Sequence, residues 1–399
     1  MSDPSPIDRL RVLVLGDPSL QDDLAAIDDR LDFAAAAATA AAQAGLTIDP
    51  ADIAAACRHD PAGIARFDAT PPTETAWPPL AWLPSALVPT VAGPAVDWAY
   101  FGAMPLTDPF FEDTRRRTNW RPLNQLCRVR TPLNALASAM PPGEQCAPDA
   151  LIFHMSRCGS TLVSQMLAAV PTNVVVSEAA PLDAVIQLAH TNPDLPADHR
   201  IELIRAMASA LGRDRFGKRA RFVIKLDSWH TLALPLIRAA FPGTPWIFLF
   251  RDPVEVMVSH KRIHGSQMVQ GMMPPGFYGF DDSALIPADE FAARALAAVC
   301  GAAIEHRGAG GGMFVDYASL PDAVEERILP HFGIVPTDAE RATMRAATAR
   351  DAKATNSTFS PDSRGKQDEA SDAVRALADQ HLAAIHRQLR MLAADAPLA

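Results

Sequence analysis

The chain has 399 residues, of which 49% are hydrophobic and 21% charged, so its composition is that of a folded protein with a hydrophobic core. Its length predicts two or three structural units. Its 46 acidic side chains outnumber the 36 basic ones, and the net charge of −10 argues against a general nucleic-acid binder. Five scattered cysteines lack the spacing of a zinc site or a disulfide scaffold. The apolar run Val12 to Leu15 is too short for a signal sequence or a membrane span, so we expect a reducing, cytoplasmic setting.

Residues 1–65 are predicted to form a helical unit. Leu20, Leu24 and Ile27 recur near helical spacing, and the alanine tract that follows ends at Gly45, a typical helix stop. The order of a helix ending in Ala-Gly-Leu and a second helix opened by Asp-Pro resembles the helical leader-peptide domains of the nitrogen-fixation type.

Residues 66–148 are rich in proline and aromatic residues, which predicts a linker or an irregular arm lying against the main body. Its aromatic side chains either cover a pocket or belong to an ordinary core. They are Trp98, Tyr100, Phe101, Phe110 and Phe111.

Residues 149–345 alternate continuous apolar runs of strand length with helical stretches, which predicts an α/β domain whose central parallel sheet is covered on both faces. The predicted strands are 150–154, 173–177, 222–226, 246–250 and 313–316. The predicted helices lie near 160–169, 198–212, 231–241, 253–263 and 287–306. Residues 346–399 are predicted to form a polar loop, 352–370, and a helix that docks its apolar stripe on the body.

The first candidate site is a strand-to-helix connection. A buried strand ends at His154, Arg157 and Gly159 lie in the following loop, and Ser160 and Thr161 open a helix. Such a loop directs backbone N–H groups and the positive end of a helix at one point, which favours an anion. The alternative is a tight connection with no ligand. The loop lacks the first glycine and the lysine of GxxxxGK[ST], so a triphosphatase is disfavoured.

A second connection of the same kind follows the strand 246–250. Arg251 lies at the carboxyl end of this strand, and Ser259 comes eight positions later, two helical turns on. Both groups can therefore face one crevice, where an arginine and a serine suit a second phosphate.

These two motifs together resemble the sulfotransferase family, which uses 3′-phosphoadenosine 5′-phosphosulfate as donor. Residues 157–161 are similar to the family's [K/R]-S-G-[T/S]-T loop for the 5′-phosphosulfate, with Cys158 in place of the serine. Arg251 and Ser259 match the family's 3′-phosphate motif. The resemblance implies a three-layer, P-loop-like sulfotransferase fold, this donor as co-substrate, and no metal.

Two later segments extend the resemblance. Tyr317 takes the place of the tyrosine that lies near the adenine in the family. Arg364 and Lys366 fall where a basic, glycine-containing loop closes over the nucleotide, although a polar loop without that role explains them equally well.

The resemblance also implies roles in the reaction. Arg157 and Lys225 are the candidates for stabilising charge on the transferred group. Glu178 resembles the carboxylate base of tyrosylprotein-type sulfotransferases, and its alternative role is a cap on the following helix. Cytosolic small-molecule sulfotransferases place a histidine base two positions after the strand lysine. Asp227 stands there in this chain, so Asp227 and His230 remain alternative bases.

The predicted activity is transfer of a sulfuryl group to a hydroxyl or amine of a small-molecule or peptide acceptor, with no nucleic-acid partner. Its rivals are a nucleotide-binding small-molecule kinase and a non-catalytic nucleotide- or peptide-binding module. The Met and Phe residues of 264–286 indicate an apolar or aromatic acceptor. A metal site is not expected, since His260 and His264 lack a third ligand at useful spacing.

Overall fold

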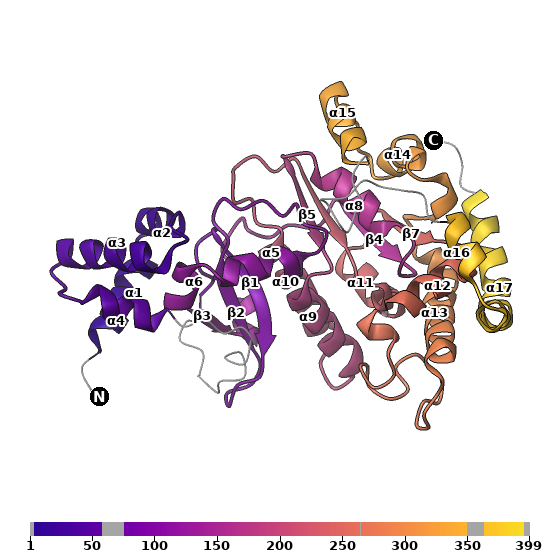
Figure 1. Ribbon diagram of the computed structural model, residues 1–399, viewed down its shortest axis with the longest axis horizontal. Coiled ribbons are helices and arrows are strands. Elements are labelled where there is room, and N and C mark those ends of the chain that lie inside the picture. The colour runs from indigo at the N-terminus through magenta and orange to yellow at the C-terminus, as the bar shows by residue number, and fades with distance from the viewer. Residues whose placement is uncertain (1–3, 58–75, 264, 349–362, 395–399) are drawn as a thin grey trace.

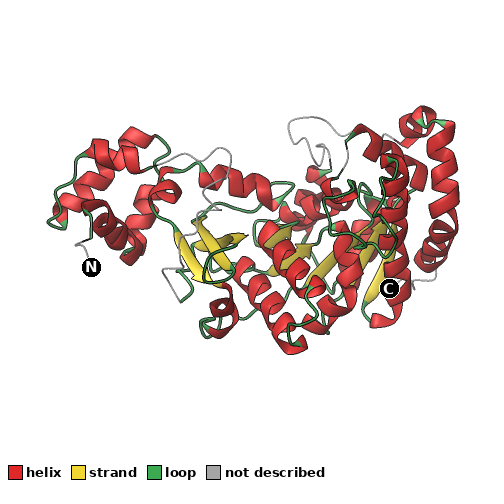
Figure 2. Cartoon of the chain, turned by 90° about the horizontal axis from the view of Figure 1, so that it is seen from below, coloured by secondary structure: helices red, strands yellow, loops and turns green. Residues whose placement is uncertain are grey.

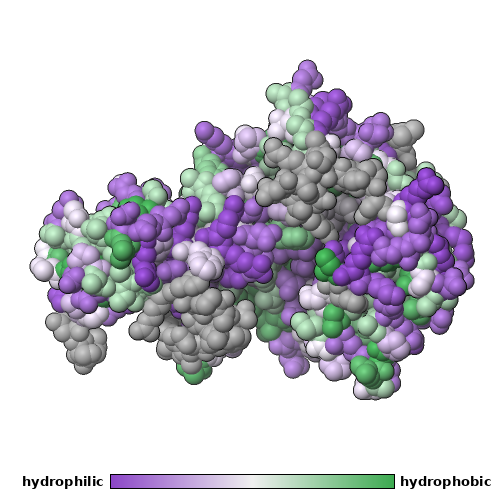
Figure 3. All heavy atoms as spheres, viewed as in Figure 1, coloured by the Kyte–Doolittle hydropathy of each residue, from purple (hydrophilic) through white to green (hydrophobic). Residues whose placement is uncertain are grey.

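The computed structural model describes residues 4–57, 76–263, 265–348 and 363–394. The molecule is elongated, with the N-terminal helices at one end, a small sheet beside them and a larger α/β domain at the other end (Figure 1). On the face shown in Figure 3, hydrophilic residues predominate over the α/β domain and apolar residues form small scattered patches. Among the described residues, no helix combines the length and apolarity that crossing a bilayer requires.

The N-terminal unit is helical, as predicted. Ser5, Asp17 and Asp49 each cap a helix by accepting backbone N–H groups, and a proline opens each of these helices. The unit is tied to the neighbouring sheet by Trp82, whose indole N–H donates to the buried Gln21 side chain at 2.9 Å. Its helices are α1 (Pro6–Gly16), α2 (Pro18–Ala25), α3 (Arg30–Gln43) and α4 (Pro50–Ala56).

The described part of the arm is more regular than predicted, because it contains a three-stranded antiparallel sheet in the order β1-β2-β3. The sequence pattern did not predict this sheet because proline is uncommon in strands. Pro84 lies inside β1, at a shift in the pairing register, and β1 is an edge strand, where proline is tolerated. The elements are β1 (Trp82–Val88), β2 (Ala95–Tyr100), α5 (Phe111–Asn119), α6 (Pro122–Leu126), β3 (Val129–Pro132) and α7 (Leu133–Ser138).

A buried arginine of the α/β domain holds the arm in place. The guanidinium of Arg213 lies 4.9 Å from the ring centre of Trp77 and 5.4 Å from that of Trp98. Its Nε donates to Glu144 at 2.5 Å, and its Nη1 donates to two backbone carbonyls of the arm. This buried cation therefore joins the two parts through its ring contacts and these hydrogen bonds, while its Nη2 has no hydrogen-bond partner among the described residues.

The α/β domain has a five-stranded parallel sheet in the order β5-β6-β4-β7-β8, with helices on both sides (Figures 1 and 2). The strands agree with the prediction to within one residue at each end. They are β4 (Ala150–His154), β5 (Asn173–Ser177), β6 (Arg221–Lys225), β7 (Trp246–Phe250) and β8 (Gly312–Asp316).

The helices of this domain agree less closely with the prediction. No bounds were predicted for helix α9, which follows Glu178. The predicted helix 231–241 is a 3₁₀ turn, Ser228–Ala233, followed by α11, which Pro235 opens. The helices are α8 (Ser160–Ala168), α9 (Ala180–Thr191), α10 (Ala197–Leu211), α11 (Leu234–Ala240), α12 (Pro253–Arg262), α13 (Ala288–Glu305), α14 (Leu329–His331) and α15 (Asp338–Ala347).

The C-terminal segment packs on α12 and α13. Residues 352–362 of the predicted polar loop lie outside the described residues, and the rest of that loop is wrong as predicted, since α16 (Ser363–Glu369) is a helix. Helix α17 (Asp372–Ala394) buries Val374, Leu382 and Leu389, as its apolar stripe predicts.

The strand order determines where a ligand can bind. From β4 the chain turns to β5 on one side of the sheet, and from β7 it turns to β8 on the other. The loops after β4 and β7 therefore separate at the carboxyl edge, which is where open α/β sheets form their ligand crevice.

Candidate active site

The loop after β4 has the backbone of an anion-binding turn. Ser156 and Arg157 have positive φ angles of 71° and 52°, a region that non-glycine residues rarely adopt, and Gly159 has a φ of 86°. Such left-handed residues bring successive backbone N–H groups to one side of the chain. The N-terminus of α8 follows directly, at Ser160.

The side chains of this loop point in different directions. The buried thiol of Cys158 donates to the Leu249 carbonyl at 3.1 Å, so an anion here would meet the main chain of Cys158 and not its sulfur. The guanidinium of Arg157 donates to the Ile263 carbonyl at 2.8 Å, at the end of α12. The loop after β4 therefore contacts the helix that follows β7.

A lysine and a glutamate meet at the carboxyl ends of β5 and β6. Nζ of Lys225 lies 2.5 Å from Oε1 of Glu178 and 3.3 Å from the hydroxyl of Thr161 at the start of α8. The Lys225 side chain is wholly buried, and the ring of Phe110 from the arm covers its ammonium at 4.8 Å. Thr161, Glu178 and Lys225, predicted as separate site residues, are thus in direct contact.

His154 completes the surroundings of Glu178. Its Nδ1 accepts the backbone N–H of Ser156 at 3.0 Å, so Nε2 carries the proton and donates to the Leu226 carbonyl at 2.8 Å. The same Nε2 lies 3.4 Å from Glu178. Burial lowers the pKa of His154, which agrees with a neutral imidazole whose role here is to hold the loop.

Two neighbouring carboxyl groups have pKa values shifted in opposite directions. Burial acts to raise the pKa of Glu178, but the charge of Lys225 and the hydrogen bond with His154 outweigh it, so this pKa lies far below its ordinary value. Burial and the charges of Glu178 and Asp183 raise the pKa of Asp227 well above its ordinary value. Divergent carboxyl groups of this kind are typical of sites that move protons.

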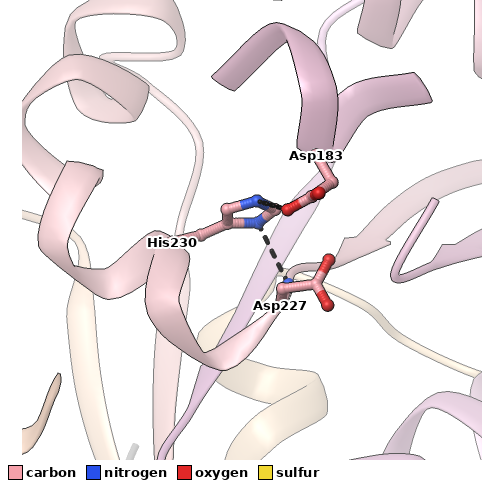
Figure 4. A group of neighbouring side chains, drawn as sticks. All are labelled: Asp183, Asp227 and His230. Carbon is pink, nitrogen blue, oxygen red and sulfur yellow. Dashed lines mark hydrogen bonds and ion pairs between the residues drawn. The ribbon is translucent and has the colours of Figure 1, made fainter. Parts of the chain in front are cut away.

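Asp183, Asp227 and His230 form a further cluster, in which one potential ligand atom from each residue lies within 4.8 Å of the others (Figure 4). Nδ1 of His230 accepts the backbone N–H of Asp227, and Nε2 lies 3.0 Å from Asp183. Asp183 also accepts the indole N–H of Trp229 at 2.8 Å. Since both imidazole nitrogens of His230 are hydrogen-bonded, the cluster is better explained as a structural hydrogen-bond network than as a cation site. For the same reason, His230 has no free nitrogen to serve as a base.

Arg251, after β7, is held on several sides. Its Nε donates to Glu255 at 2.6 Å, its Nη2 donates to Ser363 of α16 at 3.1 Å, and its guanidinium stacks 3.9 Å from the ring centre of Tyr317. Glu255 and Ser363 were not predicted. Glu255 could have been found from its i+4 position relative to Arg251 on α12, whereas Ser363 is 112 residues away and carried no signal.

Tyr317 joins the two strand-to-helix connections. A Cβ atom on Gly159 would lie 2.6 Å from Cδ2 of Tyr317, so the ring packs directly against the loop after β4 and also stacks on Arg251. The predicted phosphate motifs therefore meet at one edge of the sheet. Ser259 lies half-buried on α12 near the end that Arg157 reaches.

The remaining predicted donor residues, Arg364 and Lys366, lie on α16. Lys366 is buried and Arg364 is exposed. The helix contacts α12 through Gln367, which donates to Asp252 at 2.9 Å. α16 thus packs beside Arg251, although as a helix and not as the predicted loop.

Comparison with known proteins agrees with the motifs. Residues 148–282 match the model of the Sulfotransferase family. Three of the similar solved structures are the sulfotransferase domain from the curacin biosynthetic pathway (14% identity, 59% of this chain and 98% of that one, TM-score 0.37), that from the Synechococcus PCC 7002 olefin synthase (18%, 64% and 96%, 0.35), and the sulfotransferase STF9 from Mycobacterium avium (13%, 63% and 80%, 0.38). Among curated proteins, none matches the chain.

Proposed function

Residues 148–282 form a sulfotransferase-family domain, and from this premise we propose that the protein transfers a sulfuryl group from 3′-phosphoadenosine 5′-phosphosulfate to a hydroxyl or amine acceptor. The observation that carries the proposal is the meeting of two anion-binding features at one sheet edge. The loop before α8, with Lys225 beneath it, suits the phosphosulfate, and Arg251 with Tyr317 suits the 3′-phosphate and the base.

The proposed reaction is an in-line displacement at sulfur. A bond forms between the acceptor oxygen or nitrogen and sulfur, the bond from sulfur to the bridging phosphate oxygen breaks, and adenosine 3′,5′-bisphosphate leaves with the electron pair. Arg157, Lys225 and the backbone N–H groups of residues 157–161 would stabilise the charge that grows on the leaving oxygens. The acceptor's proton passes to a carboxylate of the protein.

Glu178 is our proposed base. In the structure it is held by Lys225, and this contact keeps its pKa too low for an efficient base. When Lys225 turns to the phosphosulfate, Glu178 loses that cation and its burial then raises its affinity for a proton. Donor binding would therefore activate the base.

Asp227 is the second candidate base, because its pKa is already raised. Its carboxylate points away from His230 (Figure 4), so it is not tied to the imidazole. The pH dependence of kcat distinguishes the two carboxylates. Replacing the base with its amide should lower kcat by a factor of about 10²–10⁴ and remove the fall of kcat at acidic pH.

The test of the proposal is calorimetry with adenosine 3′,5′-bisphosphate, followed by an acceptor screen with labelled donor. We expect micromolar binding and a loss of at least tenfold in Arg251→Ala, since a charge-assisted phosphate contact is worth about 1.5–3 kcal/mol. Glu255→Gln is the matched control, because it keeps the arginine while removing the other half of the buried ion pair.

Three results would contradict the proposal. Equal nucleotide binding by the wild type and Arg251→Ala would exclude Arg251 from the site. Preferential binding and turnover of ATP with Mg²⁺ would favour a small-molecule kinase. Nucleotide binding without transfer to any acceptor would favour a non-catalytic module.

A further inference from the structure

A groove separate from the donor site lies where the N-terminal helices meet the arm. It has a volume of about 660 Å³. Asp28 of the N-terminal unit lines one side, and the segment around Met104, Pro105 and Thr107 lines another, together with α5 and the turn after it. Its size and its position between two structural units are those of small-molecule sites in other proteins.

The groove is lined by positive charge and an exposed indole. Arg116, Arg117 and Arg121 all border it. Trp120 lies among them with 61% of its surface exposed, which is unusual for tryptophan. Guanidinium groups beside an aromatic face and apolar walls suit a ligand with an anionic group on an apolar stem.

The carboxylates around these arginines do not block such a ligand. Arg116 lies 3.3 Å from Glu112, Arg121 lies 3.5 Å from Asp28, and Arg117 pairs with Asp108. One side chain of each pair is more than half exposed: Arg116 at 67%, Asp28 at 77% and Arg117 at 58%. Exposed ion pairs of this kind contribute little, and each guanidinium has five N–H donors, so an incoming anion can share or replace the partner.

The groove connects to the proposed catalytic centre through one short segment. Thr107 lines the groove, and Phe110, three residues later, covers the ammonium of Lys225. Three residues span at most about 11 Å, so Thr107, which lines the groove, lies within that distance of the Phe110 backbone. Asp108 fixes the segment by pairing with Arg117.

We propose that this groove binds the anionic end of an elongated acceptor whose hydroxyl reaches Lys225 past the ring of Phe110. The inference rests on the proposed sulfuryl transfer and adds the acceptor class: an elongated apolar molecule that carries a carboxylate or a similar anion at the end remote from its hydroxyl. A compact acceptor would reach Lys225 without extending into the groove.

The probe is 8-(4-hydroxyphenyl)octanoate, compared with its primary amide, which has the same length without the charge. Each is titrated by calorimetry into the full chain saturated with adenosine 3′,5′-bisphosphate, and into the chain alone. We expect the carboxylate to bind about tenfold more tightly than the amide, and Arg116→Glu to reduce that ratio to about one. Trp120→Ala is expected to weaken both probes. Arg307→Glu is the matched control, because this exposed arginine precedes β8 at the opposite edge of the sheet.

The outcomes separate the groove from the reaction. Equal affinities for acid and amide in the wild type, or an unchanged ratio in Arg116→Glu that is folded by circular dichroism, would overturn the groove proposal. Transfer of label to 4-ethylphenol, which has no anionic end, tests the reaction alone. A failure of that transfer would count against the proposed function, while the binding ratio would still decide the groove.

Discussion

Replacing Lys225 with methionine removes the cation beside Glu178 and leaves a buried carboxylate without its main partner. Methionine has a similar length and fills the same space, so the change isolates the charge. Breaking a buried ion pair on one side costs about 3–5 kcal/mol, because the remaining charge loses its solvation and its partner together. For a domain of this size that corresponds to a fall in Tm of roughly 6–20 °C at neutral pH.

The pH dependence of this loss carries the sharper prediction. In the wild type the lowered pKa of Glu178 stabilises the fold above the unfolded pKa of about 4.3, and this stabilisation disappears as the pH falls toward the folded pKa. In Lys225→Met, burial acts unopposed and raises the pKa of Glu178. The variant is then most stable at low pH and loses stability as the pH rises through that raised pKa.

Thermal unfolding at pH 5 and pH 8 measures the effect. We expect the Tm deficit of Lys225→Met to be much larger at pH 8 than at pH 5. The double variant Lys225→Met/Glu178→Gln removes both charges and should regain most of the lost stability at pH 8. A deficit that is equal at both pH values, or a double variant as unstable as the single one, would refute the electrostatic account of this pair.

Three further predictions follow from neighbouring contacts. Asp227→Asn should raise Tm at pH 8 and leave it nearly unchanged at pH 4, because a raised pKa means that ionisation destabilises the folded state; thermal scans showing a loss at pH 8 would contradict this. Tyr317→Ala should weaken the binding of adenosine 3′,5′-bisphosphate about 3- to 30-fold in calorimetry, which is the loss of affinity expected from a cation stacked on an aromatic ring. An unchanged affinity would exclude this ring from the binding site. Gly159→Ala should lower the free energy of unfolding in urea by about 1–3 kcal/mol, since its φ of 86° is strained for alanine and the new Cβ meets Tyr317; a neutral effect would mean that the loop relaxes freely.

The α/β domain could be predicted because its signals are local. The strand 246–250 reads Trp-Ile-Phe-Leu-Phe and is buried along its whole length, as expected for a parallel strand covered on both faces. The loop at residues 157–161 and Arg251 followed from the same pattern, since parallel strands present their carboxyl ends at one edge, whereas Glu178 and Lys225 followed from the resemblance to the sulfotransferase family.

The arm shows where such local signals fail. Strand β1 contains Pro84 and packs both faces against neighbours, so it has neither the alternation nor the composition of a typical antiparallel strand. The placement of Phe110 over Lys225 depends on how the arm docks, through contacts between Trp77, Trp98 and Arg213. Contacts between residues more than a hundred positions apart leave no periodic trace in one sequence.

The packing of Arg213 against the arm has a consequence for how the acceptor specificity of this protein could be altered. Arg213 anchors the arm to the α/β domain through Trp77 and Trp98, and the arm in turn supplies Phe110, which covers Lys225. A different acceptor would then be accommodated by altering side chains along residues 104–120 one at a time, with the donor machinery untouched. Libraries for redesign belong on that segment, with Arg213 and its tryptophans kept as they are.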